Sequence, residues 1–372
     1  MKDPRINQLA ENLINYSCNL QKGEKILIEV NSMEIPLTVA LIEEVYKAGG
    51  IPFVTIKQGE VQEALLKQCS KEQMAAIGRY EAARMNDMDA YISIRSNNNS
   101  YELADVPTEK MSLYNKYWSH PVHHEIRVPK TKWVILRYPN HSMAQLANMP
   151  THRFEDYYFS VCNLDYSKMD KAMTPLVELM NKTDKVRVTG KTCDLTFSIK
   201  DIPAVKCAGK CNIPDGEVYT APVKTSVNGE ITYNTASPYQ GLVFENIHFK
   251  FKDGKIVEAD AGANTERLNQ ILDMDEGSRY VGEWALGVNP NVKSPIFDIL
   301  FDEKINGSFH LTPGACYDDA YNGNVSVNHW DLVYIQTPEY GGGEIWFDDV
   351  LVRKDGKFVL PELGDLNPEN LL

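Results

Sequence analysis

Hydrophobic and polar residues alternate with two different periods along the first half of the chain. Apolar residues recur at helical spacing over 3–16 and again over 36–48, where two glycines end the run. Short runs rich in Val and Ile lie between helical stretches and have the composition of strands. These predicted strands cover 25–30, 52–56, 90–94 and 133–136. Strands separated by helices predict a parallel sheet, so the first half should form an α/β domain.

The pattern changes at the polar residues 181–184, after a helical stretch over 166–180. The remaining chain consists of short strand-like runs broken by Gly, Pro and Asn, with one predicted helix over 264–272. Its strand-like runs include 195–200, 218–221, 247–251 and 343–347. We therefore predict an N-terminal α/β domain over 1–180 and a mixed α+β, strand-rich C-terminal domain over 181–372.

Composition narrows the classes of function. The chain of 372 residues is 43% hydrophobic and 24% charged, which is typical of a soluble, core-forming protein. Its net charge of −13, with Lys and Arg scattered, argues against a nucleic-acid partner. There is no secretory signal pattern and no run of roughly 18 apolar residues, so we expect no membrane contact. The 7 cysteines, an odd number spread widely, suggest a reducing compartment, and we expect a cytoplasmic protein.

Two pairs of residues each admit a structural and a functional interpretation. Arg95 and Arg137 each close a predicted strand and could face a ligand cleft at the carboxyl end of a parallel sheet, although capping of solvated strand ends is the simpler interpretation. Cys207 and Cys211 are the only close pair of cysteines in the sequence. Without a second such pair, we interpret them as structural rather than zinc-binding.

Two glutamates of the C-terminal domain occupy settings that could present a metal ligand. Glu217 follows the turn Pro-Asp-Gly at the start of a strand-like run, where a lone glutamate is usually solvated. Glu283 lies in the segment Gly-Glu-Trp-Ala-Leu-Gly over 282–287. Burying such a carboxylate costs several kcal/mol unless it is paired or bound to a metal. A salt bridge with Arg279 is the simpler alternative.

Two histidines, an aspartate and a tyrosine extend this set. His329 and Asp331 are two residues apart in the strand-like stretch 325–334, so their side chains should share one face. His310 lies in another strand-like run, and a Pro-Gly turn after it could fold the Tyr317 phenol back toward the imidazole. Taken singly, each residue is better explained by a structural role, as an edge-strand histidine, a core tyrosine or a partner in a structural hydrogen bond.

Together, three carboxylates and two imidazoles form a mixed donor set that could hold two divalent metal ions. The set suits Zn²⁺, Co²⁺ or Mn²⁺ and also admits Mg²⁺. It indicates hydrolysis. No phosphate-binding loop, dinucleotide fingerprint or Gly-x-Ser-x-Gly motif occurs, so neither a nucleotide cofactor nor a serine nucleophile is supported.

Four segments, in their order and spacing, resemble the aminopeptidase T and aminopeptidase S family of metallo-aminopeptidases. They are Asn-Ile-Pro-Asp-Gly-Glu-Val over 212–218, Gly-Glu-Trp-Ala-Leu-Gly over 282–287, Ser-Phe-His over 308–310 with Tyr317, and His-Trp-Asp over 329–331. The likeness runs through most of the chain and is strongest over 181–372.

The resemblance implies a homodimer whose C-terminal domain carries a two-metal site that removes N-terminal amino acids from short peptides. It implies that the metal ligands are Glu217, Glu283, His310, His329 and Asp331. It also implies two catalytic residues, Tyr317 and Glu283, the latter bridging the metals or assisting as a base.

Two other functions would use the same residues. A metal-dependent amidohydrolase acting on a non-peptide amide would need the same ligands and differ only in its pocket. A non-catalytic dimeric binding protein could use the ions structurally, and its mark would be metal coordination saturated by protein atoms. Assays of amino-acid amides beside dipeptides separate the first alternative from an aminopeptidase.

Overall fold

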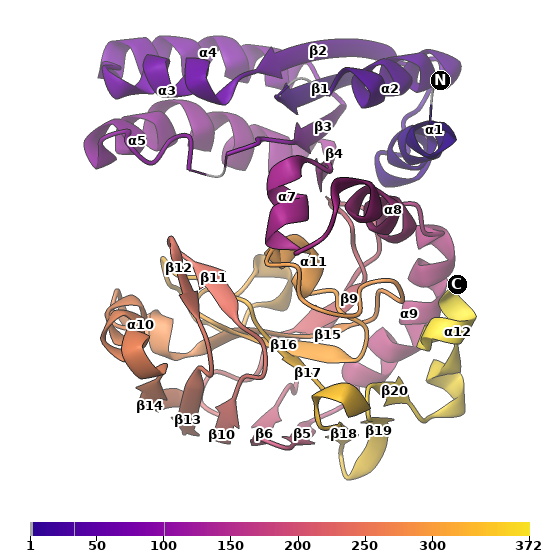
Figure 1. Ribbon diagram of the computed structural model, residues 1–372, viewed down its shortest axis with the longest axis vertical. Coiled ribbons are helices and arrows are strands. Elements are labelled where there is room, and N and C mark those ends of the chain that lie inside the picture. Colours follow the sequence, from indigo (N-terminus) through magenta and orange to yellow (C-terminus); the bar gives the residue numbers. More distant parts are fainter. Residues whose placement is uncertain (1–2, 33, 100) are drawn as a thin grey trace. The chain divides into compact units, whose positions relative to one another are not determined.

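The chain divides into two compact units, each with its own sheets (Figure 1). The computed structural model describes residues 3–32, 34–99 and 101–372. Unit 1 comprises Met1–Asn163 and Gly209–Pro214, and unit 2 comprises Leu164–Ala208 and Asp215–Leu372. The predicted division at 180/181 differs from this one in two respects. The helix over 166–180 lies in unit 2, and a short later segment returns to unit 1.

A parallel sheet with the strand order β2-β1-β3-β4-β8 forms the centre of unit 1. Its strands are β1 (Lys25–Asn31), β2 (Ile51–Lys57), β3 (Ala90–Arg95), β4 (Lys132–Arg137) and β8 (Asn212–Ile213). The first four confirm the predicted strands, and the α/β class of this part of the chain is confirmed with them. The short strand β8 comes from the returning segment and was not predicted.

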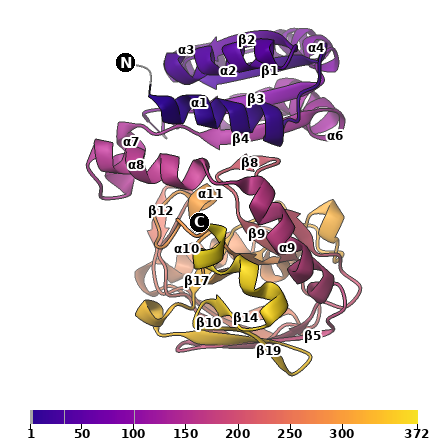
Figure 2. The same cartoon turned by 90° about the vertical axis from the view of Figure 1, so that its right-hand side faces the viewer.

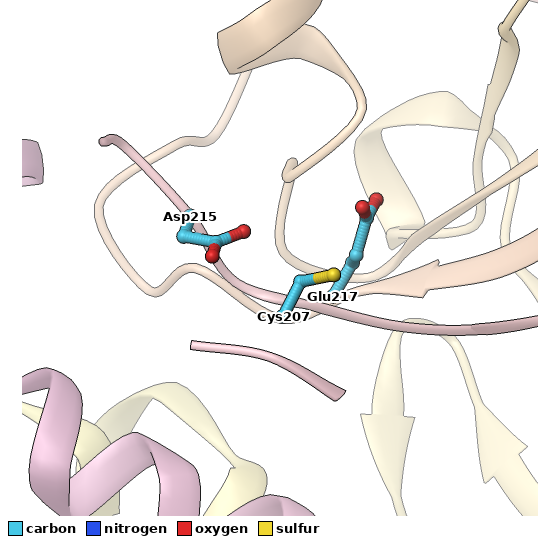
Figure 3. A group of neighbouring side chains, drawn as sticks. All are labelled: Cys207, Asp215 and Glu217. Atoms are coloured by element: carbon cyan, nitrogen blue, oxygen red, sulfur yellow. The ribbon is translucent and has the colours of Figure 1, made fainter. Parts of the chain in front are cut away.

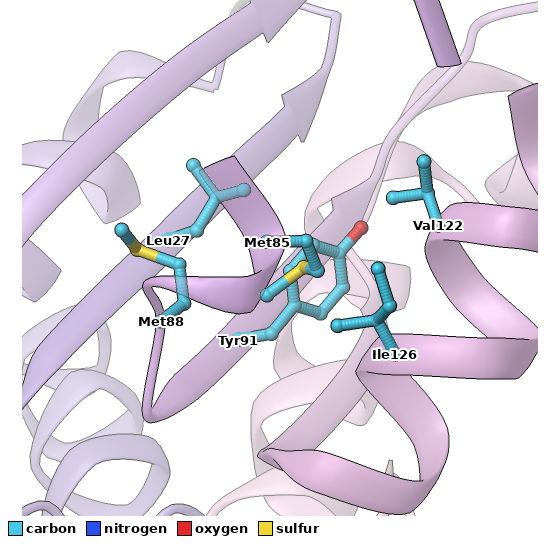
Figure 4. Packing of buried hydrophobic residues seen from close by; sticks show 6 residues of the cluster. All are labelled: Leu27, Met85, Met88, Tyr91, Val122 and Ile126. Atoms are coloured by element: carbon cyan, nitrogen blue, oxygen red, sulfur yellow. The ribbon is translucent and has the colours of Figure 1, made fainter. Parts of the chain in front are cut away.

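Helices connect the strands of unit 1 and cover its sheet. They are α1 (Pro4–Glu11), η1 (Asn12–Ser17), α2 (Ile35–Lys47), α3 (Gly59–Lys67), α4 (Lys71–Asn86), α5 (Thr108–Tyr114), η2 (Asn115–Arg127), α6 (Val128–Lys130), α7 (His141–Leu146) and α8 (Thr151–Cys162), where η marks a π or 3₁₀ segment. The predicted helix over 3–16 is therefore α1 continued by the π-helical η1. Buried residues of β1, β3, α4, the α4–β3 connection and η2 pack together in one cluster: Leu27, Met85, Met88, Tyr91, Val122 and Ile126 (Figure 4).

Several charged residues gather at the parallel sheet of unit 1. Arg95 and Arg137 end β3 and β4, as predicted, and are direct partners in the strand register. Glu29 of β1 is buried and pairs with Lys57 of β2 at 2.8 Å. The predicted ligand cleft beside the two arginines stays a prediction.

His123 of η2 is a partly buried histidine close to these charges. The Nε atom of Arg127 lies 3.2 Å from His123 Nδ1. Burial lowers the pKa of His123 to about 4, and although the charge of Glu29 opposes this shift, the charges of Arg127, Lys57 and Arg95 reinforce it. The imidazole is therefore neutral in the folded protein near neutral pH.

This lowered pKa predicts that acid weakens unit 1 before its carboxylates titrate. An unfolded histidine has a pKa of about 6.5, so the unfolded chain takes up the proton first. The contribution of neutral His123 to the free energy of unfolding is fully present above about pH 6.5. It is lost as the pH falls from there through about 4, and the total loss is no more than about 3 kcal/mol. Urea unfolding at about pH 7.5 and about pH 5 should show a smaller acid-induced loss of unfolding free energy for His123→Gln than for the unsubstituted protein.

The exposed neighbour His124 supplies the control, since His124→Gln should lose as much unfolding free energy in acid as the unsubstituted protein does. Equal losses in all three proteins would contradict the assignment.

Unit 2 contains two antiparallel sheets and a hairpin. The first sheet has the order β14-β13-β10-β6-β5-β18-β19-β20 and the second has the order β17-β16-β15-β9-β7, while β11 pairs with β12. The strands of the first sheet are β5 (Lys185–Gly190), β6 (Cys193–Ser198), β10 (Asn228–Thr232), β13 (His248–Lys252), β14 (Lys255–Asp260), β18 (Gly343–Phe347), β19 (Val350–Lys354) and β20 (Lys357–Phe358). Those of the second sheet and the hairpin are β7 (Val205–Cys207), β9 (Glu217–Thr220), β15 (Val281–Gly287), β16 (Ser308–Pro313), β17 (Leu332–Ile335), β11 (Ser237–Tyr239) and β12 (Leu242–Phe244). The strand-rich character predicted for this part of the chain is confirmed.

The two large sheets of unit 2 pack against each other around Trp284. This residue of β15 is fully buried, and its ring lies 5.1 Å from that of Phe197 on β6 and 6.0 Å from that of Phe347 on β18. The apolar side of β15 thus faces the first sheet, which leaves the opposite side of β15 for polar side chains.

The helical segments of unit 2 are mostly short. They are α9 (Tyr166–Met180), η3 (Gly262–Asn264), α10 (Thr265–Leu272), η4 (Glu276–Arg279), α11 (Ile299–Asp302), η5 (Asp318–Ala320), η6 (Pro338–Tyr340), η7 (Pro361–Leu366) and α12 (Pro368–Leu371). Helix α9 buries one stripe of apolar residues and packs on β7, β9 and η7 (Figure 2). An ion pair of 3.1 Å between Asp170 and Lys206 joins it to β7. These contacts explain why α9 belongs to unit 2.

Two further expectations concern the membrane and the thiols. None of the helices in the described part of the chain combines the length and the apolar character needed to cross a membrane. All seven cysteines are free thiols. Cys207 and Cys211, which the sequence places close together, lie in different units.

Candidate metal centre

The polar side of the second sheet in unit 2 gathers the residues singled out in the sequence. Glu217 begins β9, Glu283 lies in β15 and His310 lies in β16, three strands that are neighbours in the sheet. In the register, His310 is opposite Ala285 and Glu217 is opposite Gly287. Because side chains on one face of a sheet recur every second residue, Glu283, Ala285 and Gly287 share the face that carries the candidate ligands. The small residues leave this face to the longer polar side chains from neighbouring strands.

His329 and Asp331 reach the same place from a loop rather than a strand. The predicted strand over 325–334 is wrong in its first part, because β17 begins only at Leu332. His329 is held instead by an isolated bridge to Gly314. The two side chains still meet, with 3.3 Å between His329 Nε2 and Asp331 Oδ1.

The five side chains form two groups of possible metal ligands that share one carboxylate. Glu217, Glu283 and His310 make one group, and Glu283, His329 and Asp331 make the other. In each group the candidate ligand atoms lie within 4.8 Å of one another. Oε1 of Glu283 lies 3.0 Å from His310 Nε2, and Oε2 of the same carboxylate lies 3.5 Å from His329 Nε2. The two oxygens of Glu283 therefore face different histidines.

Neighbouring groups orient the two loop residues. The Nδ1 atom of His329 lies 2.9 Å from the carbonyl oxygen of Ala315, so it carries the proton in the neutral tautomer and leaves Nε2 as the electron-pair donor. Thr312 donates a hydrogen bond of 2.7 Å to Asp331 Oδ1. Sequence analysis did not single out Thr312 or the Ala315 carbonyl, because nothing in their local sequence marks them.

Unpaired atoms at the centre test whether metal ions fit this donor set. Among the described residues, Glu217 Oε2, Glu283 Oε2 and His310 Nδ1 are buried without a hydrogen-bond partner. A buried acceptor without a donor is costly, and a cation between the carboxylates and imidazoles would remove that cost for the two oxygens. Carboxylate oxygens and imidazole nitrogens are ordinary ligands of divalent transition metals. The residues fit.

The charges of the carboxylates act strongly on both histidines. Burial alone would lower the pKa of His310, but the hydrogen bond to Glu283 and the charge of Glu217 raise it to about 9. Burial likewise opposes the shift of His329, whose pKa the charge and hydrogen bond of Asp331 raise to about 10. The site attracts positive charge, whether protons or metal ions.

The simpler alternative for Glu283 does not hold. Arg279 pairs with Asp273 at 2.6 Å and donates a further hydrogen bond to Asn269. Glu283 is only 4% exposed, and its recorded ion pairs are those with the two histidines. The cost of burying this carboxylate is thus offset at the candidate centre.

Tyr317 lies beside the loop ligand His329. Its ring centroid is 4.9 Å from that of His329 and 5.7 Å from that of Tyr219. The residue is 49% exposed, so substrate-sized molecules in solvent can reach it. The Pro-Gly turn was expected to bring the phenol toward His310, whereas the imidazole that the Tyr317 ring contacts is that of His329.

A third group of possible ligands adjoins the first and includes Asp215, which sequence analysis did not single out. Cys207, Asp215 and Glu217 lie together where β7 meets the segment that leads into β9 (Figure 3). The ammonium group of the buried Lys304 lies 2.5 Å from Glu217 Oε1 and 3.6 Å from Asp215 Oδ1. No sequence signal marks Lys304, because its burial depends on contacts with residues far away in the chain.

Comparisons of the sequence with known proteins identify the family of the chain. Residues 2–341 match the family model of the thermophilic metalloproteases (M29). The chain is 26% identical to aminopeptidase T of Thermus thermophilus over 357 residues, covering 86% of this chain and 87% of that protein. It is 23% identical to aminopeptidase AmpS of Bacillus subtilis, with 88% of each chain covered.

Solved structures agree on the fold. The structure of AmpT from Thermus thermophilus has a TM-score of 0.80 at 20% identity and covers 96% of this chain and 99% of that one. A 2,5-dihydroxypyridine dioxygenase from Pseudomonas putida has a TM-score of 0.61 at 13% identity, with 96% of this chain and 98% of that one covered. Since the same architecture also occurs in a dioxygenase, the fold alone does not decide the reaction. The family match, which extends over most of the sequence, does indicate the reaction. The chain therefore belongs to the M29 metalloproteases, the metallo-aminopeptidases whose sequence motifs it shares.

Proposed function

We propose that this metallo-aminopeptidase removes single amino acids from the N-terminus of short peptides with two divalent metal ions held by Glu217, Glu283, His310, His329 and Asp331. The observation that carries the proposal is the placement of Glu283. Its two oxygens face His310 and His329, which belong to separate ligand groups, as expected of a carboxylate shared by two ions. Zn²⁺, Co²⁺ and Mn²⁺ suit this donor set best, and Mg²⁺ is admitted.

The chain's own residues would divide the work of peptide hydrolysis. Divalent ions bound by these residues would supply an activated water and polarise the scissile carbonyl. Glu283 would belong to both groups of ligands, and the Ala315 carbonyl and Thr312 would keep His329 and Asp331 turned toward the centre. Tyr317, next to His329, would donate a hydrogen bond to the oxyanion that develops on the substrate.

The proposal extends to the state of the protein in the cell. Seven free thiols suit a reducing compartment, which supports a cytoplasmic enzyme. A homodimer is expected from the family resemblance, and light scattering of the purified protein measures it directly.

Chelation should abolish activity, and one metal ion restored at a time should return it. Chelator-treated protein is given Zn²⁺, Co²⁺, Mn²⁺ or Mg²⁺ and incubated with short peptides, and the release of free amino acid is followed. Stepwise release from the amino end is expected, since polarisation by metal supplies several kcal/mol to this reaction. N-acetylated copies of the same peptides are the matched control and should stay intact.

Two results would favour the alternatives. Hydrolysis of non-peptide amides without release from peptides would indicate an amidohydrolase. Two tightly bound ions per chain with no hydrolysis of either class would indicate a non-catalytic role for the metals.

A further inference from the structure

Lys304 is a buried lysine whose ammonium group lies among three carboxylates beside the candidate metal centre. It follows α11, is 1% exposed, and its Nζ lies 2.5 Å from Glu217 Oε1, 2.7 Å from Glu303 Oε1 and 3.6 Å from Asp215 Oδ1. Lysine is almost never fully buried unless it is paired, so this position is strongly determined by its partners.

The backbone of Lys304 is fixed as firmly as its side chain. Its carbonyl oxygen accepts a hydrogen bond of 3.0 Å from Asn289, and its own N–H donates one of 3.0 Å to Phe301. The ammonium also occupies the group formed by Cys207, Asp215 and Glu217 (Figure 3), since it contacts both carboxylates of that group. This group therefore already holds a cation and is not a third metal site.

The contact with Glu217 distinguishes the two oxygens of that carboxylate. Oε1 accepts the hydrogen bond from Lys304. Oε2 lies 3.8 Å from His310 Nε2 and has no hydrogen-bond partner among the described residues. A charged hydrogen bond to one oxygen restrains rotation of the whole carboxylate, so the second oxygen stays turned toward His310 and Glu283.

We propose that Lys304 is a positioning residue that holds Glu217 Oε1 and thereby reserves Oε2 for the metal ion at Glu217, Glu283 and His310. The inference rests on the proposed function only in taking that group to bind an ion. The second group, Glu283, His329 and Asp331, has no recorded contact with Lys304 in the described residues, so the effect should be confined to one ion.

A purely electrostatic role predicts the opposite sign. The ammonium repels a nearby metal ion, and removing it would strengthen the binding of both ions if charge alone mattered. Loss of the restraint on Glu217 should instead weaken the binding of one ion. Residues that hold a metal ligand in place typically contribute about 10- to 100-fold to the affinity for the metal. The direction of the change therefore separates the two roles.

The test is calorimetric titration of metal-free protein with Co²⁺. Lys304→Met should weaken one of the two ions by about 10- to 100-fold and leave the other unchanged. Lys304→Arg keeps a cationic donor, so it should retain most of the metal affinity that Lys304→Met loses. The exposed Lys293 supplies the control, since Lys293→Met removes the same charge from the surface and should bind both ions as the unsubstituted protein does.

A second variant covers the case in which Lys304→Met does not fold. The double substitution Glu303→Gln with Lys304→Met removes both partners of a contact of 2.7 Å, so no carboxyl group is left unpaired at position 303 while the donor to Glu217 is lost. The same weakening of one ion is expected. Unchanged affinities, equal weakening of both ions or tighter binding in the folded variant would overturn the proposal.

These measurements need no peptide and no turnover. Protein that binds two ions and responds to Lys304→Met as expected, but releases no amino acid from peptides, would support the role of Lys304 and refute the proposed function. If the enzyme is active but Lys304→Met changes the affinity for neither ion, the proposed function would be supported and the role of Lys304 refuted.

Discussion

Glu283→Gln should lose both metal ions, and its kcat/KM should fall at least about 10³-fold. This fall corresponds to about 4 kcal/mol of transition-state stabilisation. The glutamine side chain has nearly the same volume, so the packing around β15 should survive the change. Only one of its two terminal atoms is an oxygen, and the amide nitrogen is a hydrogen-bond donor that does not bind metal. Since each oxygen of Glu283 faces a different histidine, the amide cannot serve both ion groups, and its one neutral oxygen binds a metal ion more weakly than a carboxylate does.

The number of ions lost makes this prediction specific. Elemental analysis after dialysis should find no tightly bound metal in Glu283→Gln and one remaining ion in Glu217→Gln, because Glu217 belongs to one group only. Glu230→Gln, at an exposed position of β10, is the matched control and should keep both ions and full activity. Two ions and an unchanged rate in Glu283→Gln would show that this carboxylate is not the shared ligand.

Local sequence patterns were sufficient to predict four strands of the parallel sheet and several of the other helices and strands. The strands of the parallel sheet and the helix over 264–272 were predicted because their apolar periodicity is strong and their ends carry turn residues. The two-residue strand β8 has no such pattern and exists only because the chain returns to β4. Helix α9 was predicted as a helix but assigned to the N-terminal domain, since its partners β7 and η7 lie later in the chain.

The candidate site was predictable only in part for a similar reason. Glu283 stands out because a carboxylate among apolar residues needs a partner. The other four residues were weak candidates when taken singly, and the resemblance of ordered motifs assigned them as ligands. Their role as ligands stays a prediction, although the structure brings all five side chains together. Lys304 carries no local signal, because its burial results from contacts with Asp215 and Glu217 across the fold. Pairing between distant segments is the part of the structure that periodicity does not encode.

Tyr317→Phe should lower kcat by about 10² to 10³-fold while KM and metal content stay unchanged. The substitution removes one hydroxyl group and keeps the ring, so the contact of 4.9 Å between the ring centroids of Tyr317 and His329 should persist. Burial and the negative charges of Glu283 and Asp331 raise the pKa of the Tyr317 phenol above its ordinary value, so the hydroxyl is protonated at neutral pH and can donate to an oxyanion. Because the carbonyl oxygen gains its negative charge only as the reaction proceeds, the lost hydrogen bond should affect turnover rather than substrate binding.

A second tyrosine of the same loop separates this role from a general effect of the loop. Tyr321 is 53% exposed, close to the 49% of Tyr317, and Tyr321→Phe should leave kcat unchanged. Steady-state kinetics with one peptide at saturating metal, together with metal analysis of each variant, measure all the quantities involved. A drop in kcat that accompanies loss of metal would instead make Tyr317 a support for His329. Full turnover in Tyr317→Phe with both ions bound would remove the residue from the catalytic mechanism, and stabilisation of the oxyanion would then fall to the metal ions alone.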